Sequence, residues 1–213
     1  MQSRRHFVIY DIETSGLSPE GGAEIVQIAA VKMDYNTYEI DKSSSFEIVL
    51  KPQKPDAADP KAIEVIGEDL WQRALSTGVH PKTGLRKFNQ YIDSINPSKK
   101  FWTAPILVGF NNSGFDNPFT EFWMNHYKVI GQKKNDKPWS YLSIDLLPLL
   151  FSVFGRDDMK NQKLDTYLEI MGLSREGGTH DAMEDVLLTA QLFQRYMKFM
   201  NFRIRPKIKI DNV

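Results

Sequence analysis

Two acidic side chains stand two positions apart at the end of an apolar run. They are Asp11 and Glu13, and the run before them is Phe7-Val8-Ile9-Tyr10. Side chains two apart on a β-strand project from the same face, so we expect the two carboxylates to lie together. Adjacent carboxylates repel in an apolar setting, and a bound divalent cation reverses that repulsion. The pair is therefore a candidate metal site, and the alternative interpretation is an acidic strand end that begins a turn.

A third acidic residue, Asp116, follows a second apolar run and a turn-rich stretch. The stretch is Gly109-Phe110-Asn111-Asn112-Ser113-Gly114-Phe115, where we expect a buried strand to end and a helix to begin. Capping of that helix, through backbone N–H groups and the helix dipole, explains an Asp here structurally. The same place at a strand end is also where α/β sheets build functional sites.

A histidine and a fourth candidate ligand occur together near the start of the expected last helix. The segment is His180-Asp181-Ala182-Met183-Glu184-Asp185. Asp181 and Glu184 match a capping box, which starts the helix at Asp181 and leaves His180 just before it. Asp185 borders the helix's apolar stripe, where a carboxylate is costly unless it is paired or bound to a metal. A structural or solvent-facing role is the alternative interpretation of His180.

Together these segments supply four carboxylates and one imidazole. Oxygen ligands suit Mg²⁺ or Mn²⁺ rather than zinc. Two such ions about 3.5–4 Å apart would clamp the attacking and leaving oxygens of a phosphodiester. A histidine that titrates near neutrality could take the proton from a metal-bound water. The set therefore predicts metal-dependent phosphodiester hydrolysis.

The elements that must position these residues follow from periodicity and turn residues. We expect strands over residues 7–13, 24–33, 46–51, 106–110 and 141–145, and helices over 60–66, 83–95, 117–129, 146–154, 163–171 and 181–201. The first three strands are expected to form an antiparallel meander, after which strands alternate with helices. This order predicts an α/β fold with a mixed sheet and a single domain.

Composition excludes several classes of protein. The 27 basic and 27 acidic residues balance, which argues against a broadly basic protein that coats long nucleic acid. The absence of cysteine excludes disulfides, a thiolate zinc site and a cysteine nucleophile. No stretch approaches the ~20 apolar residues of a membrane helix, and the first apolar run is too short for a signal peptide. We therefore expect a cytoplasmic (intracellular) protein without a membrane partner.

Three motifs carry a family resemblance. Asp11-x-Glu13-Thr14-Ser15-Gly16-Leu17, Asn112-x-x-Phe115-Asp116 and His180-Asp181-Ala182-x-x-Asp185 resemble the exonuclease motifs of the DnaQ-like, DEDDh family. Within that family, these motif sequences are similar to those of the nuclease domain of bacterial exonuclease I and of polymerase proofreading exonucleases. The resemblance spans about residues 7–197. It implies a ribonuclease-H-like fold and 3′→5′ hydrolysis that releases nucleoside 5′-monophosphates.

The resemblance implies a metal-binding or catalytic role for five residues. They are Asp11 as a ligand shared by two ions, Glu13 and Asp185 on the first ion, Asp116 on the second, and His180 as general base. The implied cofactors are two Mg²⁺ ions, for which Mn²⁺ substitutes. Asp145 matches a further acidic position and is expected to support the site rather than bind metal.

It also implies substrate contacts. They are Thr14 and Ser15 near the terminal 3′-OH, Leu17 as a wedge under the last bases, Phe115 against the terminal nucleotide, and Asn112 near a phosphate. We expect the substrate to be the 3′ end of mostly single-stranded DNA. RNA 3′ ends are an alternative substrate. A nuclease-fold module that docks a replication protein is an alternative function.

The C-terminal segment has a pattern of its own. Residues 1–201 are expected to form the exonuclease domain and residues 202–213 a basic tail. In the tail, Arg203, Arg205, Lys207 and Lys209 alternate with Ile and Pro, which gives an extended segment one basic edge. Such a segment is either a frayed, solvated end or a contact for phosphates or for a replication or repair protein.

Overall fold

Five strands form one mixed sheet at the centre of the molecule. The computed structural model describes residues 5–131, 137–155, 161–175 and 181–204. The strands are β1 (His6–Thr14), β2 (Ile25–Asp34), β3 (Ile40–Val49), β4 (Ile106–Gly109) and β5 (Ser143–Asp145), in the spatial order β3-β2-β1-β4-β5. β1, β2 and β3 pair antiparallel, whereas β4 is parallel to β1 and β5 is parallel to β4. The predicted meander and mixed sheet are confirmed.

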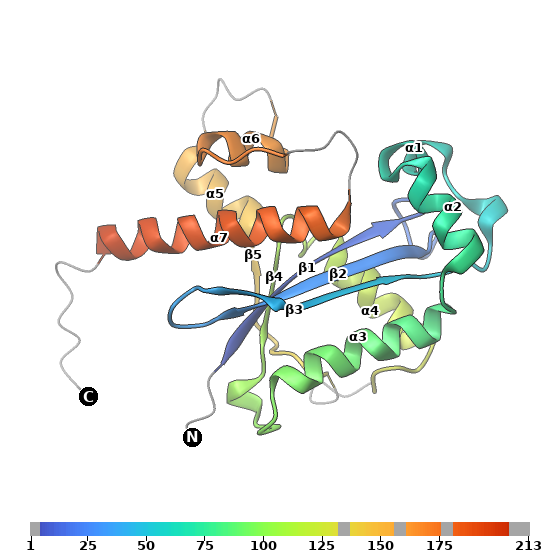
Figure 1. Ribbon diagram of the computed structural model, residues 1–213, viewed down its shortest axis with the longest axis horizontal. Helices are drawn as coiled ribbons and strands as arrows, with labels where there is room; N and C mark the ends of the chain where they lie inside the picture. The colour runs from blue at the N-terminus through green and yellow to red at the C-terminus, as the bar shows by residue number, and fades with distance from the viewer. Residues whose placement is uncertain (1–4, 132–136, 156–160, 176–180, 205–213) are drawn as a thin grey trace.

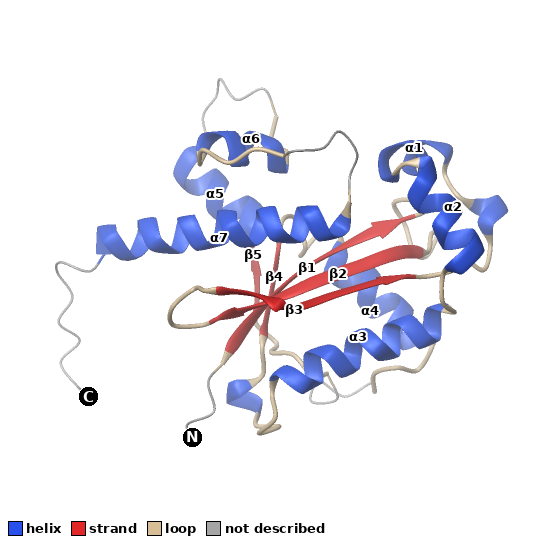
Figure 2. Cartoon of the chain, in the orientation of Figure 1, coloured by secondary structure: helices blue, strands red, loops and turns tan. Residues whose placement is uncertain are grey.

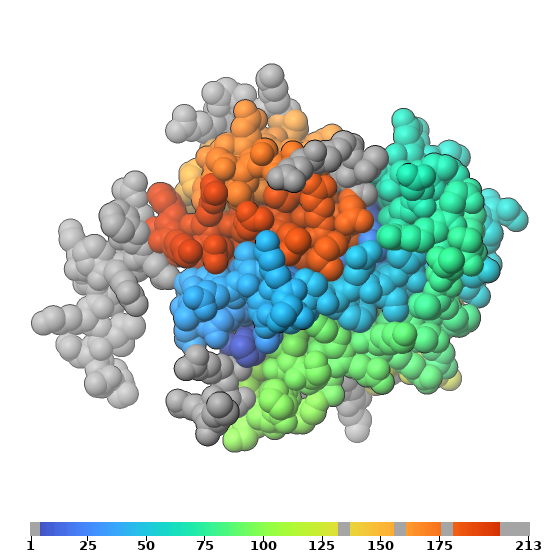
Figure 3. Space-filling model, viewed as in Figure 1, coloured from blue at the N-terminus to red at the C-terminus, as the bar shows by residue number. Residues whose placement is uncertain are grey.

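Helices cover both faces of this sheet (Figures 1 and 2). They are α1 (Pro60–Ile66), α2 (Glu68–Thr77), α3 (Pro81–Ile95), α4 (Asp116–His126), α5 (Leu146–Phe154), α6 (Leu164–Ile170) and α7 (Ala182–Ile204), with short 3₁₀ turns at Pro55–Ala57 and Phe101–Thr103. α5, α6 and α7 lie on one face, and α3 and α4 lie on the other. α1 and α2 pack beside the start of β2, against Val26. In the space-filling view, α7 lies directly against the strands (Figure 3).

The apolar run of β1 explains why the acidic pair faces α7. Phe7 and Ile9 pack into the core beneath α7, whereas Val8 and Tyr10 pack toward α3 and α4. Alternation along the strand carries the odd-numbered side chains to the same face. Asp11 and Glu13 continue that odd series, so the strand directs both carboxylates toward α7.

Several helix ends have the capping residues expected from the sequence. The Asp59 carboxylate accepts from the backbone N–H of Lys61 at 2.9 Å, and Gly67 ends α1 at a positive φ of 84°. Asp181 accepts from the backbone N–H groups of Met183 and Glu184 at 3.0 and 3.1 Å. Side-chain oxygens thereby satisfy helix N–H groups that have no partner within the helix. The last helix therefore starts immediately after Asp181, as predicted.

Three segments differ from the prediction. β3 begins at Ile40, six residues before the predicted start, and ends at Val49. α2 was missed, because Gly67 ends α1 and also precedes the first residue of α2, so the segment has no separate start signal. α7 continues to Ile204, so the prediction that Arg203 begins an extended segment was wrong. Residues 205–213 lie outside the described residues, and the division of the chain at residue 201 stays a prediction. None of the helices in the described part of the chain combines the length and apolar character that a membrane span requires.

Candidate active site

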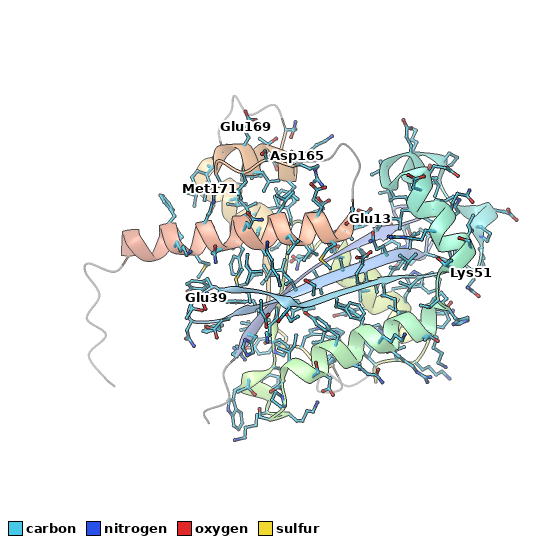
Figure 4. The ribbon with its side chains drawn as sticks, viewed as in Figure 1. Glu13, Glu39, Lys51, Asp165, Glu169 and Met171 are labelled. Carbon is cyan, nitrogen blue, oxygen red and sulfur yellow. The ribbon has the colours of Figure 1, made fainter. Side chains whose placement is uncertain are left out.

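Three predicted ligands converge where β1 ends against the first turn of α7. Asp11, Glu13 and Asp185 each offer a carboxylate oxygen, and these oxygens all lie within 4.8 Å of one another. Glu13 and Asp185 are buried, and Asp11 is partly exposed. Figure 4 shows Glu13 at the end of β1, close to the start of α7. Residues more than 170 positions apart in the sequence thus form one acidic cluster.

The fourth predicted ligand, Asp116, is held against the same strand. Its Oδ1 atom accepts a hydrogen bond of 3.1 Å from the backbone N–H of Ile12, the residue between Asp11 and Glu13. β4 pairs with β1 only as far as Ile9, so β1 extends past its parallel neighbour and Ile12 needs another acceptor. Asp116 is the first residue of α4, and Phe115 is the N-cap, so the capping interpretation of Asp116 was wrong.

Burial and repulsion between charges raise the pKa of two of these carboxylates, Asp116 and Asp11. Burial raises the pKa of Asp116 to about 7, although the N–H of Ile12 acts in the opposite direction. Burial, together with the charges of Asp116, Glu13 and Asp185, raises the pKa of Asp11 well above its usual value, and Arg175 opposes that rise. Asp11 and Asp116 therefore hold protons more tightly than ordinary carboxylates do. An all-carboxylate set of this kind fits Mg²⁺ or Mn²⁺, whose charge removes the repulsion.

Asp145 fixes the loop that leads to Asp116. Its carboxylate accepts from the backbone N–H groups of Asn111 at 2.9 Å, Ser113 at 3.0 Å and Leu147 at 3.0 Å. Asn111 has a positive φ of 61°, a conformation that Asn tolerates better than most residues. Asp145 thus caps α5 and ties the loop to β5. This agrees with the expected supporting role.

A largely apolar pocket of about 330 Å³ opens beside the cluster. Its walls include Glu13, Thr14, Leu17 and Phe115 from the predicted site, and Asp59, Lys61, Ala62, Val65 and Ile66 from α1 and its N-cap. The side chain of Leu17 is 82% exposed, although it is apolar. An apolar slot next to carboxylates can accept a flat base while its sugar and phosphate face the acidic cluster.

Two residues predicted to contact substrate also make internal hydrogen bonds, and their substrate contacts stay predictions. Ser15 is buried, its N–H donates to the carbonyl of Glu24 at 2.9 Å, and its hydroxyl accepts from the N–H of Glu24 at 2.9 Å. Asn112 has no exposed surface, and its amide donates to the Ser143 hydroxyl at 3.3 Å. Neither residue lines the pocket. These contacts stabilise the loops around it.

His180 falls among residues 176–180, outside the described residues, and its role as general base stays a prediction. Sequence reasoning missed two groups that the structure brings to the site. One is the apolar face of α1, for which Asp59-Pro60 signalled a helix but not its position. The other is Arg175, which forms an ion pair with Asp185. No local signal distinguishes that arginine from a surface residue.

Comparisons with known proteins agree with this geometry. Residues 8–193 match the model of the RNase_T family, described as exonuclease. The chain is 31% identical over 198 residues to a DNA polymerase III subunit epsilon-like protein of Rhodobacter capsulatus, covering 92% of this chain and 24% of that protein. It is 26% identical to a PolC-type DNA polymerase III of Thermotoga petrophila, covering 91% of this chain and 12% of that protein. The chain therefore spans no more than about a quarter of either relative.

A solved structure shows the same fold. The zinc-bound complex of E. coli exonuclease I with single-stranded DNA superposes with a TM-score of 0.74 at 19% identity. The match covers 95% of this chain and 42% of that one. The expected ribonuclease-H-like arrangement, a mixed sheet flanked by helices in a single domain, is thereby confirmed.

Proposed function

This chain belongs to the RNase_T exonuclease family of DnaQ-like nucleases, and on that basis we propose that it is a metal-dependent 3′→5′ exonuclease. It hydrolyses the last phosphodiester bond of mostly single-stranded DNA and releases nucleoside 5′-monophosphates. The observation that carries this proposal is the carboxylate cluster formed by Asp11, Glu13 and Asp185. Asp116 lies beside it, hydrogen-bonded to the backbone N–H of Ile12.

The four carboxylates divide between two divalent ions, Mg²⁺ or Mn²⁺. Asp11, Glu13 and Asp185 would hold one ion, and Asp11 and Asp116 would hold the other. The bound ions supply Lewis-acid stabilisation of charge on the phosphate and a more acidic water. His180, which precedes the capping residue Asp181 in the sequence, would act as the general base. The buried setting of the carboxylates supports the assignment, because such groups are stable as anions only with a cation.

The pocket beside Glu13 receives the terminal nucleotide. Leu17 and Phe115 contact the bases, and the backbone near Thr14 locates the 3′-OH. α1 closes the far side of the pocket, which favours a chain end over a continuous strand. The fold shared with a DNA-bound exonuclease I supports DNA as the substrate.

The polymerase III relatives support a role in DNA replication or repair, alongside a replication or repair partner. RNA 3′ ends are the alternative substrate, which a contact with the 2′-OH would distinguish from DNA. A docking module without activity is disfavoured, because such a protein has no need of four converging carboxylates.

The decisive experiment compares labelled oligonucleotides in Mg²⁺, in Mn²⁺ and in chelator. We expect a 5′-labelled single strand to shorten stepwise from its 3′ end, with release of nucleoside 5′-monophosphates. Matched RNA and duplex DNA run beside it. Asp11→Asn should abolish activity, and His180→Ala should lower it by at least ~10²-fold. Asp41→Asn is the matched control, since Asp41 lies on β3 paired with Lys32 at 2.9 Å, away from the cluster. Degradation that persists in chelator or in Asp11→Asn would refute the proposal.

A further inference from the structure

A single guanidinium joins α6, α7 and the acidic cluster. Arg175 forms an ion pair with Asp185 through Nη1 and Oδ1, and the same Nη1 lies 3.4 Å from Oε2 of Glu184. Its Nε and Nη2 atoms each lie 3.3 Å from Oδ1 of Asp165. The Arg175 side chain is only 11% exposed. One cation thus connects three carboxylates, of which one belongs to the proposed metal site.

The carboxylates that Arg175 contacts belong to two different helices. Asp165 lies in the first turn of α6, and Glu184 and Asp185 lie in the first turn of α7. Figure 4 shows Asp165 on the part of α6 above the N-terminal half of α7. Arginine presents several N–H donors in a rigid plane, which allows it to hold carboxylates from two elements at once. The guanidinium therefore fixes the first turn of α7 relative to α6.

We infer that Arg175 is a positioning residue that orients the Asp185 carboxylate for metal binding. The inference rests on the proposed function, because it takes Asp185 as a ligand. The ion pair at Oδ1 restricts rotation of the Asp185 carboxylate, which offers one oxygen to the acidic cluster. Hydrogen-bonded partners of metal ligands commonly act in this way, and their loss costs about 10–100-fold in metal affinity.

A purely electrostatic role and a positioning role of Arg175 predict opposite changes in cation affinity when Arg175 is removed. The direction of that change therefore tests the inference. If Arg175 served only as a counterion, its removal would leave the four carboxylates more negative. A divalent cation would then bind more tightly. If Arg175 positions Asp185, its removal weakens cation binding in spite of that added negative charge.

The experiment titrates Mn²⁺ into the full chain without nucleic acid, by calorimetry, for wild type, Arg175→Met and Arg175→Lys. We expect Arg175→Met to weaken Mn²⁺ binding by about tenfold or more. Arg175→Lys should recover little of it, because one ammonium cannot reproduce the planar set of contacts. On oligonucleotide substrate, Arg175→Met should lower kcat more than it raises KM.

Arg195→Met is the matched control. Arg195 also ties α7 to the end of α6, but it does so by donating to the backbone carbonyls of Met171 and Gly172. We expect this variant to lose some thermal stability and to keep its Mn²⁺ affinity. An equal loss of affinity in both arginine variants would assign the effect to the α6–α7 junction and overturn the inference.

Unchanged or tighter Mn²⁺ binding by Arg175→Met would also overturn it. Should that variant fail to fold, Asp165→Asn decides, since this carboxylate is 59% exposed and lies outside the metal site. A severalfold weaker affinity in Asp165→Asn supports the inference, and an unchanged affinity refutes it. Failure of the wild-type chain to bind Mn²⁺ would instead refute the proposed function, so the two failures are distinguishable.

Discussion

The Asp116 carboxylate accepts its hydrogen bond from the backbone of Ile12, between the two acidic residues of β1. The bond is made where β1 runs past the end of β4, so it completes the hydrogen bonding of the sheet and also places a fourth carboxylate at the cluster. The backbone N–H of Ile12 needs an acceptor beyond the end of β4, and a candidate metal ligand provides it. Ionisation of the Asp116 carboxylate is therefore unfavourable until a cation binds beside it.

The raised pKa of Asp116 predicts an unusual pH dependence of stability. The folded group titrates at about 7, and an unfolded Asp titrates near ~4. Between these values the folded state binds more protons, so the free energy of unfolding falls as pH rises. One group contributes at most about 1.4 kcal/mol per pH unit. Chemical denaturation of the protein in chelator, from pH 4 to pH 8, measures this slope. The raised pKa of Asp11 changes the free energy of unfolding in the same direction.

Asp116→Asn isolates the effect of this one group. The amide oxygen of Asn still accepts from Ile12 but cannot ionise, so the variant should be more stable than wild type at pH 8 and similar at pH 4. Mn²⁺ should stabilise the wild type at pH 8 and the variant much less. A wild type whose stability rises between pH 5 and pH 7 in chelator would contradict the prediction.

Substitution of Asp145 should separate loop order from metal binding. Asp145→Ala leaves three backbone N–H groups without their acceptor and removes the cap of α5, which costs about 2–3 kcal/mol in total. Asp145→Asn keeps an oxygen at Oδ1 and loses the Oδ2 contact to Ser113, so its cost should be smaller. Urea unfolding and turnover rates test this order. Equal stability of wild type and Asp145→Ala would show that the loop does not depend on this carboxylate.

Leu17→Ala should affect substrate binding without affecting the fold. The side chain is 82% exposed, so its loss should change the free energy of unfolding by less than about 0.5 kcal/mol. If it packs against the last bases, the lost contact is worth about 1–2 kcal/mol, roughly a five- to thirtyfold rise in KM. Steady-state kinetics on a short single strand measure it. Leu142→Ala, at another exposed leucine outside the pocket, should leave KM unchanged, and the same KM for all three proteins would exclude the wedge role.

The parts of the site that were predicted correctly depend on local rules. Alternation along β1 placed Asp11 and Glu13 on one face, and capping placed Asp181 at the start of α7. Proline and glycine set the ends of α1 at Pro60 and Gly67. Each of these signals acts within a few residues, where steric and hydrogen-bonding preferences outweigh tertiary context.

The parts that were missed depend on contacts between distant segments. Asn112 is buried because Ser143 of the neighbouring strand binds its amide, and nothing near Asn112 in the sequence signals that. Arg175 has no distinguishing pattern around it in the sequence, yet its guanidinium pairs with acidic residues of α6 and α7, among them the predicted ligand Asp185. Such roles follow from which elements pack together, and periodicity does not determine that packing.

Gly109→Ala should disturb the site through the burial of Asn112. A Cβ atom at position 109 would lie 2.6 Å from Cβ and 3.0 Å from Cγ of Asn112, which has no free space to move into. Overpacking of this kind typically costs about 1–3 kcal/mol. The displaced loop carries Phe115 and Asp116, so turnover should fall together with stability. Gly114→Ala is the control in the same loop, since its nearest neighbour is the flexible side chain of Asn111 at 3.2 Å, and it should change stability by less than about 0.5 kcal/mol. Thermal unfolding and initial rates of both variants test the prediction, and a Gly109→Ala protein as stable and active as Gly114→Ala would show that Asn112 can move without cost.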